Sequence, residues 1–478
     1  MIQIAEIAYY GYFTVLFGAK MLGFSEGQPV FNVALVSGAA FFMLKVLMTE
    51  HTVAEYLCGG ALLLLAGIVY LRTGEKGLMV CFTMMLGMKG VPVRRVMLLS
   101  AWIAGICLSL MTILSCIGVI REEVYILDRP PLGQIVRHTF GYPHTNTLMI
   151  TYCVFMMAVL YCVGNRSKKL TMGVSLWLLV MLFYYYLCTN SRTGLLAGII
   201  YLILNYWLQF HARFHAWEKA ACHAVYPLAA GIPILGAILY TEEPAIGVLR
   251  TILHRFQLGH AYLAENRIRL FGTRLIMPED IGNYSVDISY LYLLLCLGVA
   301  AFLVMSVLQV LLVRYCINRK QRGALAVTLT LFIMGMSEPL LYNLSFKNLT
   351  FLFLGEMLYE LLAGYKEGIW GRAVRGMRIG SSEVPASVSE GVAHLRESAK
   401  TAVLTAGRRK SVWVTATVLS AALAACYGVL MASRLTPLEG SMETARYELW
   451  CDTASVAVWG TMGCCMVMMV IMRRGQTK

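Results

Sequence analysis

The chain consists of a series of long apolar runs, most of them long enough to cross a lipid bilayer. Three runs, 102–120, 172–187 and 411–432, contain no charged residue. About 20 apolar residues in a helix match the roughly 30 Å hydrocarbon core of a bilayer. A chain inside lipid must also satisfy its own backbone hydrogen bonds, which a helix does. Since 59% of the residues are apolar and 14% are charged, the sequence predicts an all-α, polytopic helical membrane protein.

The same runs predict how the chain is organised. We expect about 12–14 transmembrane helices, with candidate spans at 3–23, 31–49, 53–71, 77–90, 95–120, 146–164, 170–189, 194–210, 222–240, 287–313, 323–341, 348–363, 411–432 and 453–472. Residues 1–363 form a membrane core with two large outer loops, 121–145 and 241–286. Residues 364–410 form a basic cytoplasmic linker, and residues 411–478 form a C-terminal pair of transmembrane helices.

Basic residues predict the orientation of the helices. The segment 364–410 holds nine Lys and Arg residues against four Asp and Glu residues, whereas the loop 121–145 holds three of each. The topology puts other basic residues on the same side as 364–410: Arg94, Arg95, Arg166, Lys168, Lys169, Arg314, Arg319, Lys320, Arg322, Arg473, Arg474 and Lys478. By the positive-inside rule this side is cytoplasmic. We therefore expect cytoplasmic termini, with 121–145 and 241–286 on the outer side.

Composition also argues against several classes of protein. The net charge of +14 follows from this topology and from attraction to anionic lipid head groups, so we expect membrane lipids and no nucleic acid as partners. Zinc sites typically contain a Cys-x-x-Cys pattern, and the 14 cysteines form none. No Asp-x-Asp pattern or histidine cluster predicts a metal, and we expect neither a metal nor a cofactor.

The first polar stretch on the predicted outer side is Arg-His-Thr-Phe-Gly-Tyr-Pro-His-Thr-Asn at 137–146. Its glycine and proline predict a turn, after which Thr145 or Asn146 caps the sixth span. Capping does not account for Arg137, His138 and His144 within eight residues, which add hydrogen-bond donors beyond what a cap needs. We predict that Arg137 and His144 belong to a binding or catalytic site, with a structural hydrogen bond as the alternative for His144.

The second stretch, 189–194, is the short connection between the seventh and eighth spans, and it contains Arg192. Small neighbours leave its backbone accessible, and the following helix begins with free N–H groups and the positive end of its dipole. The stretch predicts an anion site. The alternative is an arginine that extends to the lipid phosphates.

The long outer loop 241–286 supplies further arginines, including Arg255 and Arg267. Apolar residues recur in it at helical spacing, which predicts an amphipathic helix in the interface plane: Ile246, Leu249, Leu253 and Phe256. Arginine suits phosphate because its planar group donates two parallel hydrogen bonds. We therefore interpret the loop as a lid over a membrane-level pocket, against the alternative of salt bridges within the loop.

Acids and amides complete the outer set. Asp287 opens the tenth span, where a helix N-cap is the alternative role. Glu338 lies near the outer end of the eleventh span, where Pro339 breaks the helix, and Asn348 follows the same turn. A carboxylate near membrane depth is costly unless it is paired or functional, so Glu338 is the most informative acid in the chain.

These residues indicate a transfer reaction with an anionic leaving group. Arginines would bind a diphosphate and stabilise the charge that develops as it leaves. A carboxylate or histidine would take the proton from an attacking hydroxyl. A membrane-embedded donor with these properties is a lipid pyrophosphate that carries a glycan.

The outer motifs resemble those of bacterial capsular and exopolysaccharide polymerases in the O-antigen polymerase and ligase superfamily. The resemblance covers residues 1–363 and rests on four pieces in order: Phe140-Gly141-Tyr-Pro-His144-Thr-Asn146, Asn190-Ser191-Arg192-Thr-Gly194, Asp287-Ile-Ser-Tyr290 and Glu338 with Asn348. It implies a fold related to C-type glycosyltransferases. It also implies a multi-pass protein of the bacterial plasma membrane that joins polyprenyl-pyrophosphate-linked oligosaccharide repeat units by metal-independent, inverting transfer, with a flippase and a chain-length regulator as partners.

The resemblance also implies roles for individual residues. Arg192 would bind the pyrophosphate, with Arg255 or Arg267 as a second arginine from the large loop. Ligases of the superfamily use a late outer histidine as the base, but no histidine follows the tenth span on the predicted outer side. Glu338 is therefore the first candidate for the base and His144 the second. A ligase-like glycan transferase and a lipid-linked oligosaccharide flippase remain as alternative functions.

Overall fold

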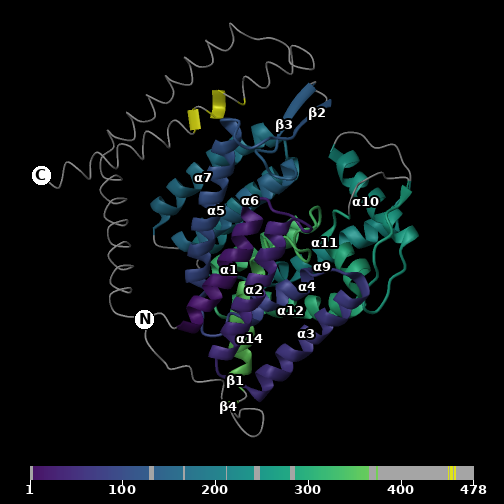
Figure 1. The fold of residues 1–478 in the computed structure, drawn as a ribbon. Coiled ribbons are helices and arrows are strands. Elements are labelled where there is room, and N and C mark those ends of the chain that lie inside the picture. The colour runs from purple at the N-terminus through teal and green to yellow at the C-terminus, as the bar shows by residue number, and fades with distance from the viewer. Residues whose placement is uncertain are drawn as a thin grey trace, which may run out of the picture.

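The computed structural model describes residues 4–128, 134–164, 167–211, 213–241, 248–279, 286–364, 373–374, 451, 453–455 and 457–458. The predicted span 411–432, most of the linker 364–410 and most of the predicted span 453–472 lie outside these residues. The described part of the chain is a helical bundle, shown in Figure 1.

Eight helices of the described residues are long and apolar enough to cross a membrane. They are α2 (Pro29–Met48), α3 (Val53–Thr73), α5 (Val93–Cys116), α6 (Thr145–Val163), α7 (Lys168–Thr189), α8 (Arg192–Phe210), α9 (Ala216–Ile238) and the helix Ser289–Asn318. The last comprises α11 (Ser289–Tyr292), a π-helical segment (Leu293–Leu297) and α12 (Gly298–Asn318). The prediction of a polytopic helical membrane protein is therefore confirmed.

The remaining predicted spans of the core are also helical. They correspond to α1 (Ile4–Met21), α4 (Gly77–Leu86), α13 (Arg322–Met334) and α14 (Thr350–Leu362). Helices α13 and α14 are short, and most of their apolar side chains are buried. They lie inside the bundle, where α13 packs against α6, α8, α9 and α12, and α14 packs against α3, α4, α5 and α12.

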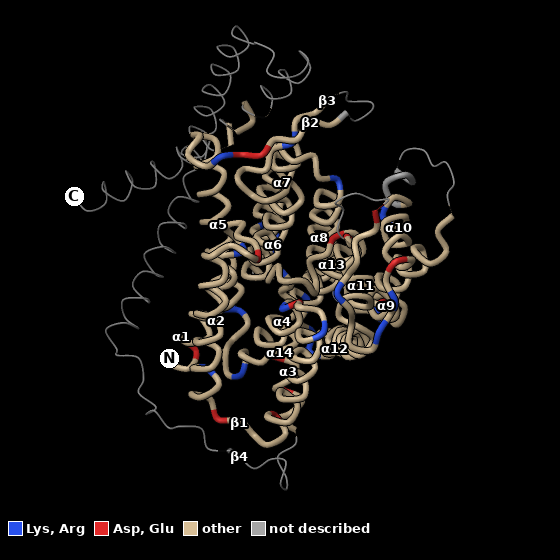
Figure 2. Tube along the Cα trace, turned by 45° about the vertical axis from the view of Figure 1, so that its right-hand side comes forward, with Lys and Arg blue, Asp and Glu red and all other residues tan. Residues whose placement is uncertain are grey.

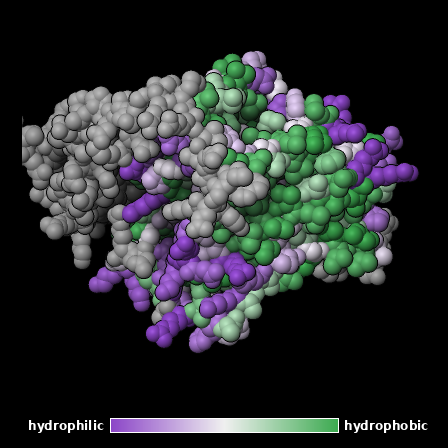
Figure 3. Space-filling view, turned by 90° about the horizontal axis from the view of Figure 1, so that it is seen from below, coloured by the Kyte–Doolittle hydropathy of each residue, from purple (hydrophilic) through white to green (hydrophobic). Residues whose placement is uncertain are grey.

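The outer helices expose many large apolar side chains, which is the opposite of what a water-soluble protein does. Val36, Leu71, Trp102 and Leu196 are among those with more than half of their surface exposed. Figure 3 shows a broad hydrophobic field bordered by hydrophilic groups. Such a surface is satisfied by lipid, because hydrocarbon chains are as apolar as the side chains that they cover.

Ion pairs of the described residues separate into two groups that match the two predicted sides of the membrane. The predicted outer side contains Glu26–Lys76, Glu122–His138 and Arg255–Asp287. The predicted inner side contains Glu6–Arg95, His51–Glu55, Glu55–Lys89, His211–Glu218 and Arg319–Glu360. No pair joins one group to the other within the described residues, and Figure 2 shows basic and acidic positions together near β2–β3 and near α10. Which group faces the cytoplasm stays a prediction.

The loop 121–145 contains a β-hairpin that the sequence analysis did not predict. Strand β2 (Val124–Asp128) pairs antiparallel with β3 (Gln134–His138), with Val124 opposite His138 and Asp128 opposite Gln134. Val124-Tyr-Ile-Leu-Asp128 is rich in residues that favour strands, and two prolines at 130–131 follow it. A second pairing joins β1 (His51–Thr52) to β4 (Ala373–Val374) at the opposite end of the molecule (Figure 1).

The large loop carries the helix that its spacing predicted, α10 (Val248–Glu265), which packs against α9. The chain after α10 then meets the start of α12 at two glycines, Gly272 and Gly298. Both have positive φ angles, +74° and +91°. A Cβ atom on Gly272 would lie 1.9 Å from the carbonyl oxygen of Cys296, and one on Gly298 would lie 2.1 Å from the Gly272 nitrogen. Only glycine permits this approach of two backbones.

Backbone hydrogen bonds hold the two segments together beside the glycines. Val299 N–H donates to the carbonyl of Arg269 (3.1 Å), and Ala300 N–H donates to the carbonyl of Leu270 (2.9 Å). The π-helical turn and the glycine break leave these N–H groups at the start of α12 without helical partners. The segment of the outer loop that follows α10 is therefore hydrogen-bonded to the start of α12 in the membrane core.

Candidate functional site

Glu338 lies in the connection between α13 and α14, beyond the end of α13 at Met334. The residue before a proline is disfavoured in helical conformation, and Pro339 follows Glu338. The connection folds back on itself, because the Ser289 hydroxyl donates to the Glu338 carbonyl (2.5 Å) and accepts from the Leu341 N–H (3.1 Å). Glu338 is 5% exposed, so the fold holds a carboxyl group inside the bundle.

Two side chains from distant helices donate to the same oxygen of this carboxyl group. Asn146, in the first turn of α6, donates from Nδ2 to Oε1 (3.2 Å), and Thr193, in the first turn of α8, donates from Oγ1 to Oε1 (2.9 Å). Oε2 accepts no hydrogen bond from the part of the chain that the structure describes. Among the described residues, Oε2 of Glu338 is therefore the oxygen that is available to a ligand.

Arg137 connects this pair to the hairpin. It lies on β3, is 8% exposed, and donates from Nη2 to Oδ1 of Asn146 (3.2 Å). Its Nε donates to the carbonyl of Thr189 (2.7 Å), in the last turn of α7. The Asn146 amide thus bridges a guanidinium group and a carboxylate, which fixes its orientation.

His144 is the N-cap of α6, so the cap falls one residue before the predicted Thr145 or Asn146. Its Nδ1 accepts the backbone N–H of Asn146 (3.1 Å). An acceptor at Nδ1 places the proton of the neutral ring on Nε2. Burial, Arg137 and Arg255 lower the pKa of His144 below its usual value, which favours this neutral form. Nε2 of His144 is then available to donate a hydrogen bond.

The large loop reaches the same site through Arg255 of α10. Arg255 forms an ion pair with Asp287, which precedes α11. Asp287 is therefore no helix cap: the residue at the N-cap of α11 is Ile288, and no side chain caps that helix. Burial raises the pKa of the Glu338 carboxyl above its ordinary value, and Arg255 is the strongest of the neighbouring charges that oppose this shift.

Lys347 is a site residue that the sequence analysis missed. It lies in the same connection as Glu338, is 4% exposed, and donates from Nζ to the carbonyl of Thr147 (3.3 Å), the residue after Asn146. Burial lowers the pKa of its ammonium group to about 7, and Lys20 adds to the effect while Glu338 opposes it. A lysine buried this deeply with so few partners is unusual, and Ser-Phe-Lys-Asn gives no periodic or motif signal for it.

The other predicted site residues, Arg192, Arg267 and Asn348, make no hydrogen bond to Glu338 in the described part of the chain. Arg192 is the first residue of α8, directly before Thr193, and it is exposed. Its guanidinium group makes no hydrogen bond or ion pair within the described ranges. Arg267 follows α10 and is also exposed, without a described link to the site. Asn348 is buried and serves the backbone: Nδ2 donates to the Leu341 carbonyl (2.9 Å), and Oδ1 accepts from the Thr350 N–H (3.1 Å).

We call Glu338, Asn146, Thr193, Arg137, Arg255 and Lys347 the Glu338 cluster. Three of its members are basic and one is acidic, and Asp287 neutralises one of the basic groups. The cluster therefore combines a buried carboxylate that has a free oxygen with a surplus of positive charge, which suits an anionic ligand next to a proton acceptor. No protein-family model, curated protein or solved structure matches the chain, and its function is therefore inferred from these residues and their geometry.

Proposed function

We propose that the protein is a bacterial polysaccharide polymerase of the plasma membrane, with cytoplasmic termini and a fold related to C-type glycosyltransferases. It joins oligosaccharide repeat units carried on polyprenyl pyrophosphate. The hydroxyl oxygen of one unit attacks the anomeric carbon of the other, and the bond from that carbon to the pyrophosphate oxygen breaks. The new glycosidic bond has inverted configuration, and polyprenyl pyrophosphate leaves with the bonding electrons.

The observation that carries the proposal is the buried carboxylate at the centre of the Glu338 cluster. Asn146 and Thr193 hold Oε1 from two different helices (3.2 and 2.9 Å). The attacking hydroxyl would give its proton to Oε2. A carboxyl group whose pKa is raised above its ordinary value is a stronger base than a solvated one, which is how buried carboxylates serve in proton transfer.

The geometry favours Glu338 over His144 as this base. The Nδ1 lone pair of His144 is used by the Asn146 N–H (3.1 Å), and the lowered pKa of the ring favours a neutral donor. His144 is better suited to donate from Nε2 to a sugar hydroxyl or to a pyrophosphate oxygen. We assign Glu338 as the base and His144 as a substrate-binding residue.

The basic groups support a pyrophosphate as the leaving group. Arg137 and Lys347 are buried, and Arg255 on the loop helix is the strongest of the neighbouring charges that act on Glu338, while Arg192 is exposed at the start of α8 without an internal partner in the described residues. Fixed positive groups stabilise charge that develops on a leaving oxygen. Arg192 is available to contact the ligand because none of the described residues binds its guanidinium group.

Reconstitution tests the proposal directly. The purified full-length protein in liposomes receives a polyprenyl-pyrophosphate-linked repeat unit without added divalent cation, and the glycans are separated by length. A ladder of products, lost in Glu338→Gln and kept in the exposed-loop control Arg274→Lys, supports a polymerase. A single addition to a foreign acceptor indicates a ligase instead. Unchanged glycan length with donor lipid moved between leaflets indicates a flippase, and either result overturns the proposal.

A further inference from the structure

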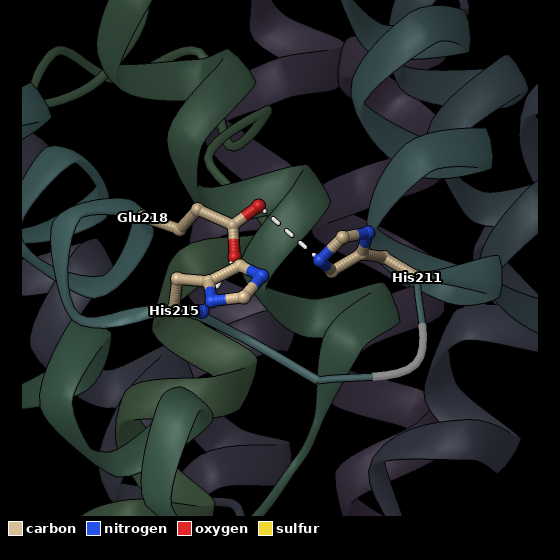
Figure 4. Close-up of side chains that lie close together, drawn as sticks. All are labelled: His211, His215 and Glu218. Atoms are coloured by element: carbon tan, nitrogen blue, oxygen red, sulfur yellow. Dashed lines mark hydrogen bonds and ion pairs between the residues drawn. The ribbon is translucent and has the colours of Figure 1, made fainter.

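A second group of side chains lies at the opposite end of the bundle, where α8 turns into α9. It consists of His211, His215 and Glu218, which we call the His211 cluster, and Figure 4 shows the three side chains converging. Each offers one ligand atom, and these three atoms lie within 4.8 Å of one another. The charge pattern places this turn on the predicted cytoplasmic side, away from the Glu338 cluster.

The cluster is held in place by the fold. His211 is the residue that ends α8, where its N–H donates to the Trp207 carbonyl (2.9 Å). Its carbonyl accepts from Arg322, at the start of α13, and its ring lies 5.3 Å from the Trp207 ring and 6.1 Å from the Phe214 ring. His215 is the N-cap of α9, and Glu218 lies in the first turn of that helix. The three residues, spaced as His-x₃-His-x₂-Glu, therefore lie at the connection between α8 and α9, and each helix holds one end of it.

The carboxylate of Glu218 divides its two oxygens between the backbone and the cluster. Oε2 accepts the backbone N–H of His215 (2.6 Å). Oε1 lies 3.2 Å from Nε2 of His211, a ring nitrogen that is buried and makes no hydrogen bond of suitable angle with the described residues. The two atoms are close together but not aligned as donor and acceptor, which is the arrangement of two ligands that share a third partner.

From this geometry we propose that, contrary to the expectation from the sequence, the His211 cluster binds one divalent transition-metal ion, with Zn²⁺ as the best-suited ion. Nitrogen and oxygen ligands lie about 2.0–2.2 Å from Zn²⁺, so ligand atoms around a tetrahedral ion are roughly 3.4 Å apart. The distance of 3.2 Å from His211 Nε2 to Glu218 Oε1 is close to this value, and the exposed side chain of His215 offers its ligand atom within 4.8 Å of the other two. Water would take the fourth ligand position of the ion.

The surroundings favour an ion that is held by imidazole nitrogen. Arg322 adds a positive charge beside the turn, where it also lies over the Phe214 ring at 5.3 Å. This charge opposes any cation, and one carboxylate does not outweigh it for Mg²⁺ or Ca²⁺, which need several oxygen ligands. Two imidazoles and one carboxylate suit zinc and its neighbours in the first transition series.

The ion would fasten the end of α8 to the start of α9. Its effect is therefore on stability, and it takes no part in the transfer reaction at the other end of the bundle. Zinc binding and glycan polymerisation are independent, so failure of one experiment leaves the other unaffected.

Zinc binding to the full-length protein, purified in detergent with an affinity tag that lacks histidine, tests this inference. Equilibrium dialysis against Zn²⁺ compares the natural protein with His211→Ala, His215→Ala and Glu218→Gln. His223→Ala, further along α9, is the matched control. We expect one tightly bound zinc in the natural protein and in the control, and a loss of affinity of at least about tenfold in each of the three variants.

Glu218→Gln separates loss of zinc binding from loss of folding. The amide oxygen of glutamine still accepts the His215 N–H, while the negative charge of the ligand is lost. Zinc should raise the melting temperature of the natural protein and of His223→Ala, and should leave that of Glu218→Gln unchanged. No zinc bound by the natural protein overturns the proposal. Equal binding by the natural protein and all three variants does so as well, because it assigns the ion to another site, such as one of the 14 cysteines.

Discussion

Replacing Glu338 by glutamine and by alanine separates its chemical role from its structural one. In Glu338→Gln the amide oxygen takes the place of Oε1, so the hydrogen bonds from Asn146 (3.2 Å) and Thr193 (2.9 Å) remain. Only the free oxygen Oε2 is changed, from a proton acceptor to an N–H donor. Glu338→Ala removes both hydrogen bonds and leaves two polar side chains without their acceptor.

The two variants should therefore differ in stability and agree in activity. A positioned general base contributes about 10²–10⁴-fold to a rate, which corresponds to roughly 3–5 kcal/mol of activation free energy. We expect both variants to lose this factor in kcat. A hydrogen bond to a charged group contributes about 1.5–3 kcal/mol. The relief of a buried charge offsets part of that loss, so Glu338→Ala should be less stable by about 2 kcal/mol or more, and Glu338→Gln nearly as stable as the natural protein.

The assay pairs initial rates of glycan extension in liposomes with thermal unfolding of the same preparations in detergent. Donor affinity is measured separately, because loss of the base should lower kcat and spare binding. Full turnover by Glu338→Gln would refute the assignment of Glu338 as the base. Weakened donor binding with unchanged kcat would instead give Glu338 a role in shaping the pocket.

Three further predictions concern other parts of the molecule. Burial lowers the pKa of Lys347 to about 7, so its side chain is charged below that pH and neutral above it. If this charge stabilises pyrophosphate, kcat/KM falls as pH rises through about 7. The variant Lys347→Arg stays charged and should remove this fall. Arg192→Lys should abolish most glycan extension without lowering the melting temperature, because an ammonium group cannot donate two parallel hydrogen bonds. Arg274→Lys is the control. Equal activity of the two variants would contradict a role of Arg192 in binding pyrophosphate. Gly272→Ala should destabilise the protein by more than about 1 kcal/mol, whereas Gly60→Ala on α3, with open space around it, should not; equal melting temperatures would count against the close backbone approach.

The helical part of the fold could be predicted from the sequence because lipid imposes a simple rule on it. A span has to be long, apolar and internally hydrogen-bonded, and runs such as 95–120 and 170–189 show all of this locally. The hairpin β2–β3 escaped prediction because it lies in a loop between the apolar runs, where length and hydropathy carry no such constraint. The π-helical turn at Leu293–Leu297 escaped it too, because length and hydropathy do not distinguish it from the rest of the apolar run in which it lies.

The candidate site was predictable by residue type but not by connection. Glu338, Arg137, His144 and Arg255 stand out in the sequence as polar groups at the ends of apolar runs. The bond between Asn146 and Glu338 joins residues 192 positions apart, and no local pattern records it. Lys347 could not be singled out, because burial, which makes it unusual, is a property of the folded chain.

The close approach of Gly272 and Gly298 has a consequence for how sequences related to this one can diverge. Neither position tolerates a side chain while the backbone of the other segment is in place. A substitution at one glycine therefore cannot be compensated by a substitution at the other. Chains that keep this crossing should carry glycine at both sites, and chains that have lost it should be free to change both. The pair would then vary as a unit, and a relative with glycine at only one of the two positions would have to take another path from α10 to α12.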